Sequence, residues 1–292
     1  MPPVTVRPPR PEDAEAAFAV IAARDSADLG FVDYTLGDLH SDWNRPDVDS
    51  WVAELDGRIA GTAAVDALGA MVCVDPAAEG KGVGTALRGA VEARMRERGQ
   101  PLLRQAIAAT NHGARRLLAA AGYGVGHVYL TLRADLAAPQ AAARGAPAEA
   151  AIRPLERPGD EVPAHRLIQE TFADIEGNVE QPFDDWRADR LDRADLELPV
   201  WLLLEDAEGL AGVLTGRSRE GIGYVEELGV ARRARGRGHG RALLLAAFEH
   251  FRSAGLAACE LSVHGRNASA QGLYASVGLR EERRAERWER PA

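Results

Sequence analysis

The pattern of apolar and polar residues along the chain predicts strands and helices that alternate. Short apolar runs such as Met71-Val72-Cys73-Val74 and Leu102-Leu103 have the length of buried strands. Leu87, Val91 and Met95 recur at helical spacing, until Gly99 and Pro101 end that helix. Strands that alternate with helices predict an α/β fold with a central, partly parallel sheet.

The same pattern occurs twice. Gly80, Gly82 and Gly84 precede Gly236, Gly238 and Gly240 by 156 positions (236 − 80), with no gap in the register. The same offset joins Val74 to Val230, Leu87 to Leu243, Asn111 to Asn267 and Gly122 to Gly278. A fixed offset of this kind predicts two copies of one domain. We expect a first domain over 1–135, a linker over 136–150, which is poor in large apolar residues, and a second domain over 151–292.

Local signals place further elements in each copy. A helix should run from Pro11 to about Ala23, and a hairpin should turn at Asp56-Gly57. In the second copy a helix is expected over 161–172, and a last hairpin near 280–288. That hairpin and the segment 172–186 should form the acceptor wall.

Composition and charge exclude several classes of protein. The 292 residues carry a formal net charge of −9, which argues against nucleic-acid binding. No apolar run reaches membrane-spanning length and no signal peptide is evident, so we expect a soluble, cytoplasmic protein with no membrane partner. The sequence leaves open whether it is a monomer or a homodimer. Cys73 and Cys259 should be reduced core thiols, and His239, His250 and His264 lack metal-ligand spacing, so no metal is expected.

The stretch that follows Val230 has the composition of an anion-binding loop. Three alternate glycines precede an apolar helix, and five arginines surround them, at positions 232, 233, 235, 237 and 241. Glycine allows the backbone to approach a ligand, helix N–H groups favour negative charge, and guanidinium groups bind phosphate oxygens in pairs. The expected ligand is a pyrophosphate. Neither the P-loop nor the dinucleotide-binding pattern is present.

Two motifs carry a resemblance to a known family. Arg235-x-x-Gly238-x-Gly240 resembles the acetyl-CoA signature of the GCN5-related N-acetyltransferase (GNAT) superfamily, and Asn267-x-x-Ala270-x-x-Leu273-Tyr274 resembles its second motif. The resemblance implies two tandem GNAT domains, each a mixed central sheet flanked by helices, in an arrangement similar to that of the mycothiol synthases. It also implies acetyl-CoA as cosubstrate.

The second copy has the residues that acetyl transfer to an amine requires. Glu226 and Glu227 alternate across a strand that ends at the glycines, so one should face the substrate. The resemblance makes Glu226 the first choice for the base. Glu227 is then the alternate, or a group that holds the acceptor's cation. The non-functional alternative is a solvated acid pair. Tyr274 is the candidate acid, or otherwise a core tyrosine. The expected cofactor-binding residues are Leu228, Gly229, Val230, Arg235, Gly236, Arg237, Gly238, His239, Gly240, Arg241 and Asn267, the last of which is also a favoured helix cap.

The first copy lacks these groups. Glu79 stands at the place of Arg235, Ala70 and Met71 at those of the acid pair, and Leu118 at that of Tyr274. A carboxylate beside a phosphate weakens binding unless its side chain turns away. We therefore expect this copy to be catalytically silent. Its retained residues form a candidate second cofactor site: Val74, Gly80, Lys81, Gly82, Val83, Gly84 and Asn111.

These features together predict an acetyl-CoA-dependent N-acetyltransferase. The acetyl group should pass directly to a primary amine of a small molecule, with the chemistry in the C-terminal domain. Acids at positions 174, 176, 180, 184 and 185 favour a cationic amine, unless they form a solvated loop. The alternatives are a non-catalytic acetyl-CoA-binding or scaffold module, or acetylation of a protein N-terminus or a hydroxyl.

Overall fold

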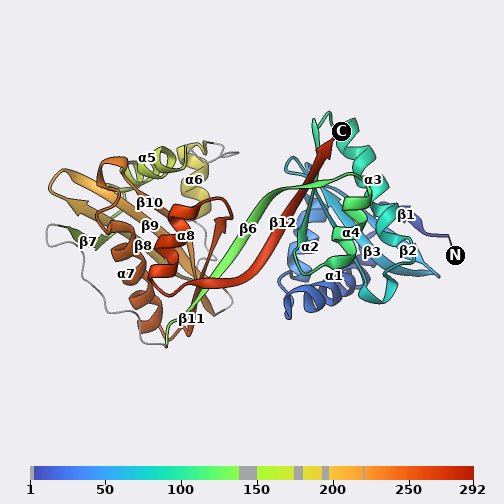
Figure 1. The fold of residues 1–292 in the computed structure, drawn as a ribbon, viewed down its shortest axis with the longest axis horizontal. Helices are drawn as coiled ribbons and strands as arrows, with labels where there is room; N and C mark the ends of the chain where they lie inside the picture. The colour runs from blue at the N-terminus through green and yellow to red at the C-terminus, as the bar shows by residue number, and fades with distance from the viewer. Residues whose placement is uncertain (1–2, 138–149, 174–179, 193–196, 220) are drawn as a thin grey trace. The chain divides into compact units, whose positions relative to one another are not determined.

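The computed structural model of the chain describes residues 3–137, 150–173, 180–192, 197–219 and 221–292 (Figure 1). The chain divides into two compact units, Met1–Tyr129 with Arg283–Ala292 and Leu130–Glu282. Most of the predicted linker over 136–150 lies outside the described residues, and so do Asp174 and Glu176 of the predicted acceptor wall. Within the described residues, no helix combines the length and the apolar character of a membrane span.

The amino-terminal unit has a mixed sheet in the order β1-β2-β3-β4-β5-β12. The pairs are antiparallel except β4 with β5, which is parallel. Its elements are β1 (Thr5–Arg7), η1 (Pro11–Asp13), α1 (Ala14–Leu29), α2 (Leu36–Asn44), β2 (Asp49–Leu55), β3 (Arg58–Val65), β4 (Ala70–Val74), η2 (Pro76–Ala78), α3 (Val83–Glu97), β5 (Leu102–Ala108), α4 (His112–Ala120), the start of β6 (Gly124–Asp135) and most of β12 (Arg280–Pro291).

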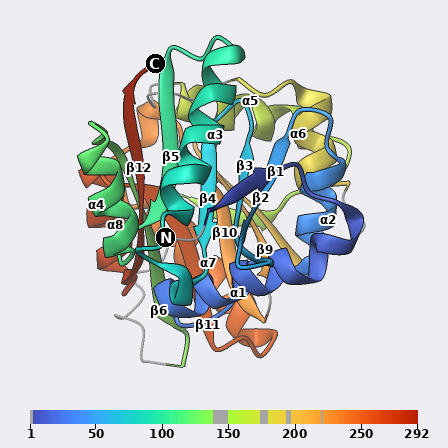
Figure 2. The ribbon, with the colours of Figure 1, turned by 90° about the vertical axis from the view of Figure 1, so that its right-hand side faces the viewer.

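Helices cover both faces of this sheet, because its strands are apolar on both sides. Val52 packs with Ala17 and Ile21 of α1 and with Leu39 of α2, whereas the next residue, Ala53, packs on the other side with the apolar face of α3. Successive strand residues point to opposite faces, so one strand feeds two cores. In Figure 2, α3 lies in front of the strands of this unit.

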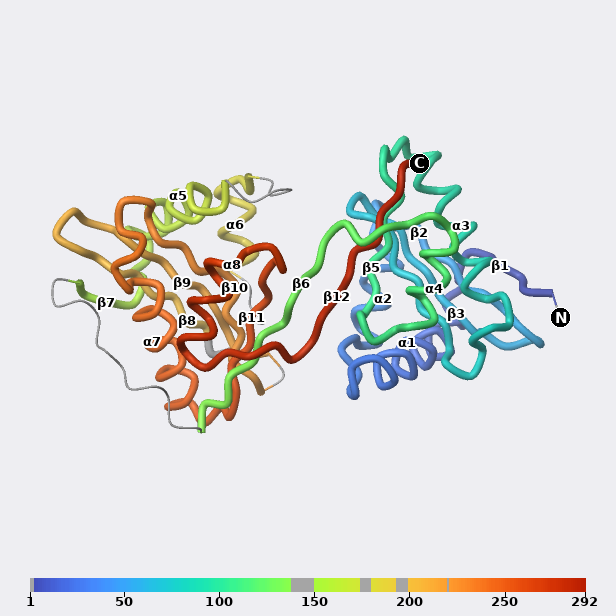
Figure 3. Tube along the Cα trace, in the orientation of Figure 1, coloured from blue at the N-terminus to red at the C-terminus, as the bar shows by residue number. Residues whose placement is uncertain are grey.

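The last strand corrects one expectation. Residues 280–291 form the single strand β12, not a hairpin. Its residues Ala285 to Pro291 pair antiparallel with Ala108 to Leu102 of β5 (Figure 3). Trp288 is buried in the amino-terminal core. Residues 280–290 are mostly charged, so they carry no apolar pattern that would predict this partner. The end of the chain therefore pairs with β5 of the amino-terminal unit, as a strand and not as half of a hairpin.

The carboxy-terminal unit repeats the plan, with strands in the order β6-β11-β10-β9-β8-β7. The pair β10 with β11 is parallel, and the pairs from β10 to β7 are antiparallel. Its elements are β7 (Ala151–Pro154), α5 (Glu161–Phe172), α6 (Phe183–Arg190), β8 (Glu197–Asp206), β9 (Gly209–Arg219), β10 (Ile222–Val230), η3 (Arg232–Ala234), α7 (His239–Ser253), β11 (Ala258–His264) and α8 (Ala268–Ser276). The predicted α/β class with a mixed central sheet is confirmed.

Both copies keep the same charged anchor at their first strand. The Arg7 guanidinium bonds Asp13 at the start of α1 and Glu54 of β2. The Arg153 guanidinium bonds Asp160 at the start of α5 and Glu205 of β8 in the same way. Each anchor joins the first strand, the first helix and the second strand of its unit.

Candidate functional site

Glu226 and Glu227 lie at an irregularity of β10. Val225 is paired with Gly216 and Glu227 with Thr215, so Glu226 is an extra residue in the ladder. The parallel pairing with β11 is recorded up to Val225. A bulge of this kind redirects side chains, and here it does so where β10 and β11 part.

Glu227 is held on both carboxylate oxygens. Its Oε2 accepts hydrogen bonds from Trp186 Nε1 at 3.1 Å and from Thr215 Oγ1 at 3.0 Å. Its Oε1 is 3.6 Å from Arg190 Nε. The side chain is 11% exposed and Trp186 is fully buried, so these contacts fix a largely desolvated carboxylate against α6.

Glu226 is held on one oxygen. Arg217 Nε donates to Glu226 Oε1 at 2.9 Å, and the side chain is 13% exposed. Within the described residues, no partner is recorded for its Oε2. This oxygen can accept a proton, whereas both oxygens of Glu227 are engaged.

The peptide groups that follow the bulge open toward β11. Ala231 N–H donates to Ala211 O of β9 at 2.9 Å, and Gly229 is paired with Val213. Because antiparallel pairs alternate, the N–H groups of Leu228 and Val230 point away from β9, into the space where β11 has diverged. Backbone donors directed there can bind a carbonyl or amide oxygen.

The glycine loop has the backbone of an anion-binding site. Gly236 and Gly238 have φ of 77° and 87°, values that residues other than glycine rarely adopt. Gly238 is the N-cap of α7 and supplies no side-chain cap. Within the described residues, no acceptor is recorded for the N–H groups of His239 and Gly240, so the positive end of α7 is open to an anion.

The arginines of this loop do not act alike. Arg235 Nε donates to Val230 O at 3.2 Å, which folds its side chain over the loop. Arg233 instead donates to Asp206 and to the carbonyls of Gly209 and Leu210. The hydrogen bond from Arg233 lowers the pKa of the Asp206 carboxyl. Arg233 therefore ties the loop to the β8–β9 turn.

The side chain of His239 is buried, which the sequence did not predict. It is the first residue of α7 and is 3% exposed, and neither ring nitrogen has a hydrogen bond in the described part of the chain. Its Nε2 lies 3.8 Å from Asp206 Oδ2. The ring packs beneath the loop, so what it can give a ligand directly is its backbone N–H.

The second motif forms α8. Asn267 Oδ1 accepts from Ala270 N–H at 3.1 Å, so Asn267 caps this helix. A Cβ on Gly240 would lie 3.0 Å from Leu273 Cδ2, so α8 approaches the third glycine closely. The hydroxyl of the next residue, Tyr274, has no hydrogen-bond partner among the described residues. Burial raises the pKa of Tyr274 to about 12, so its hydroxyl is protonated at neutral pH.

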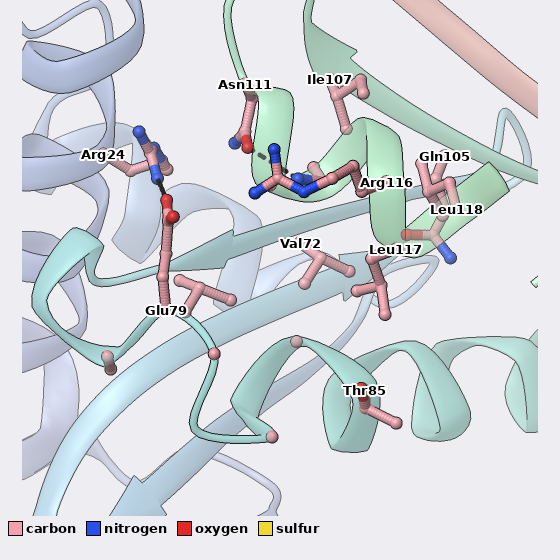
Figure 4. Close-up of a pocket in the computed structure, with 17 residues that line it drawn as sticks. Arg24, Val72, Glu79, Thr85, Gln105, Ile107, Asn111, Arg116, Leu117 and Leu118 are labelled. Atoms are coloured by element: carbon pink, nitrogen blue, oxygen red, sulfur yellow. Dashed lines mark hydrogen bonds and ion pairs between the residues drawn. The ribbon is translucent and has the colours of Figure 1, made fainter. Parts of the chain in front are cut away.

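The amino-terminal unit has a cavity of about 380 Å³ at the corresponding place (Figure 4). It lies where β4 and β5 part, since their recorded pairing consists of Ala70 with Gln105 and Met71 with Ala106. Gly80, Gly82 and Gly84 line it together with Asn111, and Leu118 stands where the second unit has Tyr274. Arg24 and Glu79 meet at its edge.

Neither cysteine is a candidate nucleophile. Both are buried and free, and burial raises the pKa of Cys73 to about 12 and that of Cys259 further. In the part of the chain that the structure describes, no group of histidine, cysteine and acidic residues could hold a metal ion.

Comparison with known proteins identifies the family. The model of the acetyltransferase (GNAT) family matches residues 19–123 and again 164–279. The mycothiol acetyltransferase of Acidothermus cellulolyticus is 30% identical over 256 residues, which cover 79% of this chain and 75% of that protein. That of Clavibacter michiganensis subsp. michiganensis is 34% identical over 254 residues, which cover 77% and 74%.

Solved structures of this family have the same fold. A GCN5-related N-acetyltransferase from Sphaerobacter thermophilus superposes with a TM-score of 0.83 at 26% identity, over 99% of this chain and 95% of that one. A tandem GNAT protein from the clavulanic acid biosynthesis pathway shares the fold, with a TM-score of 0.75 at 17% identity over 99% and 98%. The predicted tandem fold is confirmed, and the chain belongs to the acetyltransferase (GNAT) family as an N-acetyltransferase with two GNAT domains.

Proposed function

We propose that the chain transfers an acetyl group from acetyl-CoA to a primary amine of a small molecule, and that the chemistry takes place in the carboxy-terminal unit. The observation that carries the proposal is the difference between the copies. One has Glu226, Glu227 and Tyr274 around its glycine loop, and the other has Ala70, Met71 and Leu118 at the same places. A base and an acid are absent together from one unit and present together in the other.

The residues of the second unit suit this coenzyme. Its diphosphate would lie on the open N-terminus of α7, beside Arg235, Arg237 and Arg241. The N–H groups of Leu228 and Val230 would bind its amide arm and polarise the acetyl carbonyl. When bound, acetyl-CoA supplies an acetyl thioester; the new bond is to the amine nitrogen, and the coenzyme leaves as a thiol.

Glu226 would take the proton that the amine loses. An alkylamine with a pKa near ~10 is mostly protonated at neutral pH, so a base at the site, acting directly or through water, raises the reactive fraction. Of the four carboxylate oxygens of Glu226 and Glu227, Glu226 Oε2 is the one without a contact among the described residues, and for this reason we keep Glu226 as the base. Glu227, with both oxygens engaged, would hold the acceptor's cation as a fixed negative charge.

Tyr274 would return a proton to the departing thiolate. Burial raises its pKa to about 12, which keeps the proton on the phenol but makes the phenol a weak acid. Desolvation also raises the pKa of a thiol, so a thiolate that forms where water is excluded becomes a stronger base toward the phenolic proton.

Thiol release from acetyl-CoA in the presence of a panel of small amines tests the proposal. We expect turnover with at least one amine, and a decrease of about 10²-fold or more in kcat for Tyr274→Phe. Tyr129→Phe, which removes a phenol from the amino-terminal unit, is the matched control. A protein that binds acetyl-CoA but releases no thiol with any amine would favour a non-catalytic binding module. Activity confined to alcohols or peptide N-termini would move the acceptor to another class.

A further inference from the structure

The Glu79 carboxylate lines the cavity of the amino-terminal unit and is bound there by Arg24. Arg24 Nη1 donates to Glu79 Oε1 at 2.5 Å, and a Cβ on Gly113 would lie 3.2 Å from Glu79 Oε2. Glu79 thus extends from the glycine loop to α1 and to the first turn of α4, as Figure 4 shows for its approach to Arg24. Glu79, Arg24 and Gly113 all line the cavity, as the glycine loop itself does.

Arg24 is fixed by a second carboxylate. Its Nη2 donates to Asp28 Oδ1 at 2.6 Å, and Asp28 Oδ2 accepts from Asn111 Nδ2 at 3.0 Å. The Arg24 side chain is 11% exposed. Arg24, Asp28 and Glu79 together carry a net charge of −1, and Asn111, a predicted cofactor residue, is engaged in the same network. Arg116 also lines the cavity and adds a positive charge to it, apart from this network.

In the second unit, the described positions that match Glu79 and Arg24 carry other groups with other contacts. Arg235 stands at the place of Glu79 (79 + 156), and its side chain folds back to Val230 O. The first helices match at an offset of 147, at which Ala17 and Ala164 are both fully buried, so Thr171 takes the place of Arg24 (24 + 147). The Thr171 hydroxyl bonds the carbonyl of Ile168 in its own helix.

We propose that Glu79, held by Arg24, closes the amino-terminal cavity to the diphosphate of the coenzyme and is the residue that determines its selectivity. A diphosphate on this glycine loop would meet the Glu79 carboxylate, and like charges at short range disfavour binding. The chain then binds one coenzyme, in the carboxy-terminal unit. The inference rests on the proposed function for the identity of that ligand.

Isothermal titration of the full chain with coenzyme A tests this. We expect one coenzyme per wild-type chain and two per chain for Glu79→Arg, with the second dissociation constant within about tenfold of the first. Glu79→Gln should give a second site of intermediate affinity, because it removes the charge and keeps the shape. Glu97→Arg makes the same change of charge at the far end of α3, where the side chain is 64% exposed, and should bind as wild type does.

The outcomes separate this inference from the proposed function. Two coenzymes per wild-type chain, with dissociation constants within about tenfold, would overturn it. So would a single coenzyme in both Glu79 variants when their circular dichroism and melting match the wild type. A wild type that binds none while Glu79→Arg binds one would support the inference and refute the role of the carboxy-terminal loop.

Discussion

Trp186 donates its indole N–H to Glu227 over 3.1 Å, and this bond links a helix outside the sheet to the bulge in β10. Thr215 donates to the same oxygen from the neighbouring strand. Two neutral donors on one oxygen keep the carboxylate in place as the negative group that we assign to holding a cationic acceptor.

Thr215→Val should therefore destabilise the protein. It removes one donor from a largely buried carboxylate at nearly constant volume, which costs about 1–3 kcal/mol. Urea unfolding measures this loss. Thr215→Ser keeps the hydroxyl and should recover most of it, so equal losses in the two variants would exclude the hydrogen bond as the cause.

Glu226→Gln should decrease kcat by about 10²-fold or more, because a general base typically contributes 10²- to 10⁴-fold. Glu227→Gln should chiefly raise the KM for the acceptor, because Glu227 would bind the acceptor and Glu226 would move its proton. Steady-state kinetics with the preferred amine distinguish the two effects. Glu249→Gln, an exposed change on α7, is the control. If Glu227→Gln lost kcat and Glu226→Gln did not, the assigned roles would be exchanged.

The raised pKa of Tyr274 predicts how this phenol ionises at alkaline pH. Burial raises its pKa to about 12 in the folded protein, above the ordinary value of about 10 for a tyrosine, so the folded state holds the phenolic proton more tightly than the unfolded state. This stabilisation is complete below about pH 10 and is lost as the pH rises to about 12. In a spectrophotometric titration, Tyr274→Phe should lack one phenol that ionises near the upper end of this range. A phenol missing near pH 10 instead would show that Tyr274 is solvated.

Local signals in the sequence were enough for much of the fold. The Asp56-Gly57 turn forms as predicted, with φ of 51° and 74°, and α5 has the predicted bounds of Glu161–Phe172. The helix α2 was missed, although Thr35 and Asp38 form a capping box at its start. The partner of β12 could not be predicted, because pairing between residues more than 170 positions apart leaves no local pattern.

The candidate site shows the same division. The two motifs identified the glycine loop and Asn267, because these residues lie next to one another in the sequence. The contacts of the acid pair with Trp186, Arg190 and Arg217 depend on how α6 and β9 pack, and no spacing predicts them. The contact of His239 with Asp206 has the same origin, since Asp206 lies in a distant turn.

The charged anchors predict how stability depends on acid. The hydrogen bond from Arg153 lowers the pKa of the Asp160 carboxyl below its ordinary value, so the folded state favours the ionised form. Asp160 therefore contributes stability above its unfolded pKa of about 3.9, and loses it as the pH falls through the lower folded value. Arg153→Met should lower the midpoint of urea unfolding at pH 7, and the difference from wild type should shrink as the solution is acidified through the pKa of Asp160.

Arg252→Met is the control. It removes an ion pair in which both side chains are more than half exposed, so it should leave the midpoint nearly unchanged at either pH. A deficit for Arg153→Met that is the same at pH 7 and in acid would mean that the guanidinium acts through packing, because packing does not depend on the charge of Asp160.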